Sequence, residues 1–163
     1  MQVRDELQRK AARVAANAEL RDVRATELQA DLISIPESDD LTFEVATESA
    51  YSSISDEGRC VYRLRVAVVA REGEEEVFKA QVTMAALYSL PPDASDDELR
   101  AFGDVTAALA LYPYVRAAIQ DLAARTGIPS VTLPVYQVAL ELEDGESPPV
   151  ALSKIEAEDQ NQP

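Results

Sequence analysis

Four stretches of the chain alternate between apolar and polar residues, which is the pattern of a β-strand with one buried face. Successive side chains of a strand point to opposite faces of the sheet, so each stretch offers an apolar face to a core. The apolar positions are Leu28, Ala30 and Leu32; Leu41, Phe43 and Val45; Tyr62, Leu64, Val66 and Val68; and Phe78, Ala80, Val82, Met84, Ala86 and Tyr88. A polar turn with one glycine, residues 71–76, joins the last two stretches. We therefore expect an antiparallel meander of four strands in chain order.

Two later stretches have the spacing of amphipathic helices. Ser95 and Glu98 match a capping box, in which each side chain binds the backbone amide of the other residue, and they predict a helix over residues 96–109. Because Pro113 has no amide hydrogen, we expect it to separate this helix from a second one over residues 113–125. Gly127 follows the second helix as its C-terminal cap.

The chain divides into three parts. Residues 1–20 place Leu7, Ala11, Val14 and Ala18 at helical spacing, so they predict an amphipathic N-terminal helix. Residues 21–140 hold the strands and the other helices. Residues 141–163 are rich in Glu, Asp, Gln and Pro, which predicts a disordered acidic tail with a short helix near Leu152. The expected fold is α+β: a four-stranded antiparallel sheet with two helices on one face, plus an extra N-terminal helix.

The charge and the missing residue types exclude several classes of function. The chain has 30 acidic and 15 basic residues and a net charge of −15, which repels phosphate and anionic lipid. We therefore expect neither nucleic acid nor direct membrane binding. The chain has no histidine, which excludes histidine-based triads and histidine metal ligands. A single cysteine, Cys60, and a charged, polar N-terminus suit a cytoplasmic protein.

No pattern of catalytic residues is recognisable. The five glycines are scattered singly, so no phosphate-binding loop is expected, and the carboxylate clusters do not match a calcium-binding loop. No nucleophile stands beside a base in any known arrangement. The residues alone predict a non-enzymatic α+β domain without a metal or cofactor.

A longer pattern carries a family resemblance. An aromatic-Pro-Tyr-x-Arg helix start is followed by apolar positions, a glycine and a Leu-Pro-Val strand, between Leu111 and Val135. The matching residues are Pro113, Tyr114, Arg116, Ile119, Arg125, Pro129, Leu133 and Val135. This segment, with the hairpin before it, resembles the SecB family of export chaperones. The resemblance implies an ATP-independent holdase without a cofactor, a homotetramer built as a dimer of dimers, which binds unfolded client polypeptides in apolar grooves.

Departures from the family pattern bear on the choice of partner. The family's acidic Lys-Asp-x-Ser-x-Glu run is replaced by residues 29–34, Gln-Ala-Asp-Leu-Ile-Ser. The N-terminal helix is similar to that of SecB-like chaperones in toxin–antitoxin–chaperone systems, so the resemblance favours a chaperone that stabilises an antitoxin. Glu74, Glu75 and Glu76 are retained, and in the family this turn helps to dock the Sec motor ATPase. A general export chaperone that delivers precursors to that motor is therefore the alternative. A non-chaperone scaffold that binds one folded partner is an alternative of another class.

The resemblance and the apolar pattern together suggest a client-binding groove. Its candidate residues are Leu41, Phe43, Val45, Met84, Tyr88, Leu90, Ile119, Leu122, Val131 and Leu133. The competing interpretation is that most of these residues form the core of the domain. We expect the groove for Leu41, Phe43 and Leu90, which lie near loops, whereas Ile119 and Leu122 fit the core at least as well.

Overall fold

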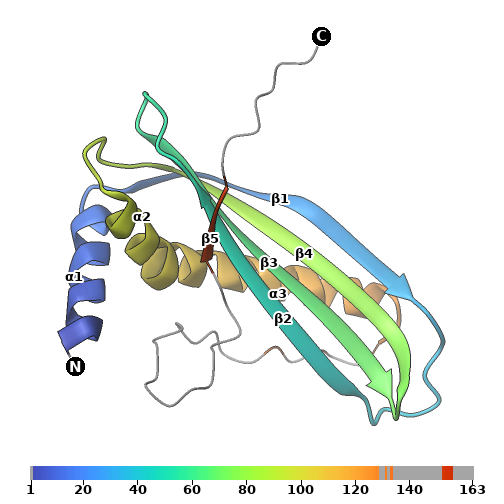
Figure 1. The fold of residues 1–163 in the computed structure, drawn as a ribbon. Coiled ribbons are helices and arrows are strands. Elements are labelled where there is room, and N and C mark those ends of the chain that lie inside the picture. The colour runs from blue at the N-terminus through green and yellow to red at the C-terminus, as the bar shows by residue number, and fades with distance from the viewer. Residues whose placement is uncertain (1, 129–130, 132, 134–151, 156–163) are drawn as a thin grey trace.

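The computed structural model describes residues 2–128, 131, 133 and 152–155, which form an α+β fold with helices on one face of a sheet (Figure 1). The strands are β1 (Glu19–Leu32), β2 (Thr42–Ser52), β3 (Arg59–Glu72), β4 (Glu75–Ser89) and β5 (Leu152–Ile155). The helices are α1 (Gln2–Ala15), α2 (Asp96–Phe102) and α3 (Ala108–Arg125), with a π-helical turn η1 (Gly103–Ala107) between the last two. The four long strands and the helical layer confirm the predicted fold class. No helix in the described ranges is long and apolar enough to cross a membrane.

The strands are not arranged as a meander in chain order. The order across the sheet is β1-β4-β3-β2-β5, and the four long strands pair antiparallel. The prediction is therefore right for the β2–β3–β4 part and wrong for β1, which pairs with β4. The connection from Leu32 to Thr42 crosses the end of the sheet. Three strand spacings are only about 14 Å, which a connection of this length spans easily.

The two ends of the chain also differ from the sequence prediction. The N-terminal helix ends at Ala15 rather than near residue 20, because Glu19 and Leu20 already pair with β4. The segment around Leu152 is a strand, β5, rather than a short helix, and it pairs parallel to the end of β2. Backbone pairing to an open sheet edge outweighs the weak helical tendency of so short a segment.

The start of α2 is fixed by the predicted capping box. Glu98 accepts a hydrogen bond from the Ser95 amide at 2.9 Å, and the Ser95 side chain accepts one from the Glu98 amide. Arg13 of α1 forms ion pairs with Glu98 and, at 2.9 Å, with Asp93, so the same carboxylate ties α1 to α2. The Ser95 amide and then Arg13 hold the pKa of Glu98 below its ordinary value of 4.5. The added N-terminal helix is thus anchored on the helical layer.

Pro113 does not separate two helices, contrary to the prediction. It lies inside α3, which runs without a break from Ala108 to Arg125. Pro113 and Leu109 are both exposed. Water can therefore bind the Leu109 carbonyl, which an amide at position 113 would otherwise bind. The irregular turn is η1, which precedes the proline. The helix ends as predicted, with Gly127 at φ +74°, a conformation that glycine adopts without strain.

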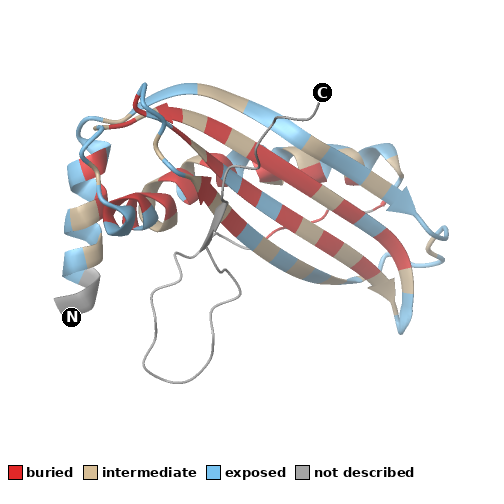
Figure 2. Cartoon of the chain, turned by 45° about the horizontal axis from the view of Figure 1, so that its top comes forward, coloured by how far each residue is buried: buried red, intermediate tan, exposed pale blue. Residues whose placement is uncertain are grey.

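The core lies between the sheet and the helices. Bands of buried and less buried residues alternate along β3 and β4 (Figure 2), so one face of each strand meets the helical layer as predicted. Four aromatic rings join the layers, with centroids 5.1–5.9 Å apart, and they belong to Tyr51, Tyr62, Tyr88 and Phe102. The Tyr62 hydroxyl donates a 2.9 Å hydrogen bond to the Leu99 carbonyl of α2. This contact satisfies a buried polar group and fixes α2 on the sheet.

Asp104 in η1 gives the fold a pH dependence. Burial raises the pKa of its carboxyl from 3.8 to about 6, while Arg100 opposes the shift. Between these pH values the carboxyl therefore keeps its proton in the folded state and has lost it in the unfolded state. Above pH 6 the carboxyl is charged in both states, and its burial then lowers the stability of the fold by the full amount. We expect Asp104→Asn to raise the free energy of unfolding by about 1–2 kcal/mol near pH 7, after allowance for solvent screening.

The gain from Asp104→Asn should disappear near pH 3.5, below both pKa values. Urea unfolding at the two pH values measures it. Asp121→Asn is the control, because Asp121 is exposed on α3 and, within the described residues, forms an ion pair with Arg125 alone. An equal effect of Asp104→Asn at both pH values would contradict this account.

Candidate polypeptide-binding surface

Three apolar side chains of the predicted groove lie side by side at one edge of the long-stranded sheet. Leu41, Phe43 and Val45 are half-buried and pack against the core. Phe43 is paired with Ala70 and Val45 with Val68, both of which are buried, so these side chains are on the helix-covered face. Part of this apolar surface remains open to solvent, which makes it available to a ligand. We call Leu41, Phe43 and Val45 the β2 apolar strip.

The other predicted groove residues are less accessible. Leu122 is half-buried on α3. The remaining six are buried in the core, and they are Met84, Tyr88, Leu90, Ile119, Val131 and Leu133. Leu90 is 5% exposed, so the expectation of an open groove position is wrong for this residue and the core interpretation holds. A client can reach these six side chains only if the helical layer moves away from the sheet.

A second apolar surface was not anticipated. β1 carries Leu20, Leu28 and Leu32 on the helix-covered face, opposite buried residues of β4, yet all three are exposed. Leu28 is 56% exposed, and Ile35 in the following loop is 82% exposed. The alternation of Leu28, Ala30 and Leu32 predicts a strand face that is buried in the core. The structure shows instead that β1 is an edge strand, and Leu28 and Leu32 remain exposed although Ala30 packs against the core.

The acidic turn lies between β3 and β4. The Glu74 and Glu75 side chains are exposed and make no ion pair within the described residues. Glu76 is different, because it forms ion pairs with Arg71 at 2.7 Å and with Lys79, and Lys79 contributes most to holding its pKa below 4.5. Two of the three predicted docking carboxylates are therefore free to meet a cationic partner.

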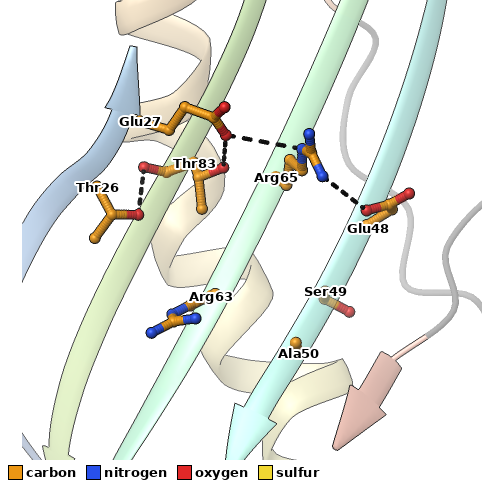
Figure 3. Close-up of a pocket in the computed structure, with 8 residues that line it drawn as sticks. All are labelled: Thr26, Glu27, Glu48, Ser49, Ala50, Arg63, Arg65 and Thr83. Carbon is orange, nitrogen blue, oxygen red and sulfur yellow. Dashed lines mark hydrogen bonds and ion pairs between the residues drawn. The ribbon is translucent and has the colours of Figure 1, made fainter. Parts of the chain in front are cut away.

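The uncovered face of the sheet has a polar hollow of about 690 Å³ (Figure 3). Glu27 accepts hydrogen bonds from Thr83 at 2.9 Å and from Gln81 at 2.6 Å, which are the main reasons why its pKa lies below 4.5. Arg65 lies between Glu27 at 3.8 Å and Glu48 at 3.7 Å. The two carboxylates balance the two guanidinium groups, and the lining has no large apolar side chain that could bind those of an unfolded chain.

Arg63 is the exception in this hollow. It is exposed, and within the described residues it forms no ion pair (Figure 3). Its cross-strand neighbours are Ala50 and Ala85, whose small side chains leave the space around it open. The two faces of the sheet thus offer different chemistry: polar and charge-balanced on the uncovered face, apolar at the edges of the covered face.

Comparison with known proteins identifies the family. The profile of the family described as preprotein translocase subunit SecB matches residues 27–140. The chain belongs to the SecB family. It is 31% identical, over 86% of its length and 89% of the relative, to the SecB-like chaperone Rv1957 of Mycobacterium tuberculosis strain H37Rv. The SecB-like chaperone MT2006 of strain CDC 1551 of that species has the same identity and coverage.

A solved structure supports the same assignment. It is the Mycobacterium tuberculosis Rv1957 SecB-like chaperone in complex with a ChAD peptide from the Rv1956 HigA1 antitoxin. The TM-score is 0.72 at 30% sequence identity, and the match covers 81% of this chain and 96% of that one. The SecB-like fold of this chain is therefore shown by both its sequence and its structure.

Proposed function

We propose that this SecB-family protein is an ATP-independent chaperone that holds unfolded polypeptide and stabilises the antitoxin of a toxin–antitoxin–chaperone system. The observation that carries the proposal is the match, over most of both chains, to a SecB-like chaperone solved with an antitoxin peptide. The activity requires accessible apolar surface and needs no catalytic group, nucleotide or metal.

The β2 apolar strip is the part of the described surface that best fits this activity. A client gains about 1–3 kcal/mol for each large apolar side chain that it buries, so several contacts along an extended segment are needed. Phe43 and Val45 supply neighbouring contacts on one strand, and Leu41 adds a contact just before it. The net charge of −15 keeps copies apart in solution, which allows a protein to expose such surface without precipitating.

Suppression of aggregation tests the proposal. We expect the purified protein, without ATP, to prevent light scattering by several unrelated proteins diluted from denaturant. It should also protect the antitoxin encoded beside it, if its gene lies in such an operon. A scaffold for one folded partner would protect that partner alone, so selective protection contradicts the holdase proposal.

A general export chaperone is the second candidate, and the exposed carboxylates of Glu74 and Glu75 favour it. Clustered carboxylates can dock a basic surface of the Sec motor ATPase in a salt-dependent manner. Binding of the purified motor at low salt, with no binding of an antitoxin, would support this function over the first.

We further propose a homotetramer. The support is the row of exposed apolar side chains on β1 and its following loop, because monomeric proteins rarely leave so many together in solvent. Self-association would also cover the exposed edge of β1. Multi-angle light scattering at micromolar concentration should give the mass of a tetramer, and a monomer mass would contradict the proposal.

A further inference from the structure

The edge of β2 is only partly occupied. β5 pairs with residues 49–52 of β2, while β2 itself begins at Thr42. On this side, residues 42–48 have no partner strand among the residues that the structure describes. An edge of this kind presents unpaired amide and carbonyl groups, which is a template for another extended chain.

β5, the strand that pairs with residues 49–52 of β2, is held only weakly. β5 has four residues, against eleven in β2, and it pairs in the parallel direction (Figure 1). Parallel pairing is slightly less stable per residue than antiparallel pairing, and so short a ladder forms few hydrogen bonds. The pairing of β5 shows that the edge accepts an added strand, and its shortness means that another strand can displace it.

The side chains beside the open edge define what fits there. Phe43 and Val45 of the β2 apolar strip point to the helix-covered face and are half-buried. A strand added at residues 42–48 would place every second side chain on that same face, next to these two residues. The matching partner is an extended segment with an apolar residue at every second position.

We infer that unfolded polypeptide binds by adding a strand to the edge of β2, and that β5 is the chain's own occupant of the end of that edge. The inference rests on the proposed holdase function and specifies its binding mode. Main-chain hydrogen bonds supply affinity that is independent of client sequence, and the β2 apolar strip selects alternating apolar side chains. Full use of the edge by a client requires β5 to leave.

Displacement of β5 has a measurable cost. If the whole edge is free about one-tenth of the time, the apparent affinity for a client that needs it is lowered about tenfold. Ser153→Pro removes the central amide of β5 and restricts its backbone, which disfavours pairing. Gln160→Pro is the matched control, because it places the same residue in the same terminal region beyond β5.

The probe is a short fluorescent peptide in which valine alternates with threonine, and its partner is the same peptide N-methylated at successive central residues. N-methylation keeps the side chains but removes the amide donors. Fluorescence anisotropy with the full-length protein should show at least about tenfold weaker binding of the N-methylated peptide. Equal binding of the two peptides would overturn strand addition and leave a purely side-chain groove.

The variants test the role of β5. Ser153→Pro should bind the unmodified peptide about three- to tenfold more tightly than the native protein, while Gln160→Pro should not. Without any peptide, hydrogen exchange at residues 49–52 should become faster in Ser153→Pro. Unchanged exchange would show that β5 does not occupy the edge, and faster exchange without tighter binding would overturn the competition. If neither peptide nor any denatured protein binds, the proposed function itself fails, whereas the exchange result still reports on β5.

Discussion

Replacing Leu41 and Phe43 together with serine is expected to weaken the binding of unfolded polypeptide by about 5- to 30-fold. Each side chain is only partly exposed in the free protein, so at most roughly a third of the 1.5–3 kcal/mol available from full burial remains for a client. Two such losses amount to about 1–2 kcal/mol of binding free energy. Anisotropy titration with a fluorescent, permanently unfolded protein measures the change.

The control for this double variant lies on the same strand. Glu44 and Ala46 are exposed and alternate with the β2 apolar strip, so Glu44→Ser with Ala46→Ser changes the opposite face of β2. It should leave client affinity nearly unchanged. Far-ultraviolet circular dichroism must show that both variants remain folded. Native affinity in the folded Leu41→Ser, Phe43→Ser protein would place the client elsewhere.

Phe102→Ala is expected to have the largest effect on stability, a loss of about 3–5 kcal/mol in the free energy of unfolding. Phe102 is 1% exposed and its ring contacts those of Tyr62 and Tyr88 at centroid distances of 5.4 and 5.1 Å. Truncation leaves a cavity at the point where the helical layer is joined to the sheet. Urea unfolding followed by circular dichroism measures the loss.

Leu109→Ala is the matched control for this prediction. Leu109 follows Phe102 by two helical turns but is 43% exposed, so its truncation removes little buried surface. We expect a change below about 1 kcal/mol. If Phe102→Ala lost no more than this control, the aromatic contacts would not be the main link between the layers.

Local patterns predicted the elements of this fold because their causes are local. The alternation of Tyr62, Leu64, Val66 and Val68 correctly assigned one face of β3 to the core. Ser95 and Glu98 lie within one helical turn, so their reciprocal hydrogen bonds could be predicted from spacing alone. The same holds for the turn at Gly73, whose φ is +61°.

Features that depend on distant residues were not predictable in this way. The partner of β1 is chosen by the packing of the whole sheet, and nothing near Leu28 indicates that this residue pairs with β4 in an edge strand. Pro113 was expected to break a helix, but its exposed position makes the missing hydrogen bond tolerable. Candidate groove residues such as Ile119 and Leu90 could not be separated from core residues by pattern, because both kinds of site require apolar side chains.

The pairing of β1 with β4 has a consequence for how the protein is made. Leu32 pairs with Phe78 and Glu19 with Ser89, so about 60 residues separate β1 from its partner. At a translation rate of about 5–20 residues per second, β1 waits about 3–12 s on the ribosome before that partner has been synthesised. During this time Leu20, Leu28 and Leu32 belong to an extended segment without a neighbouring strand. Each new copy thus begins as the kind of chain that we propose finished copies bind.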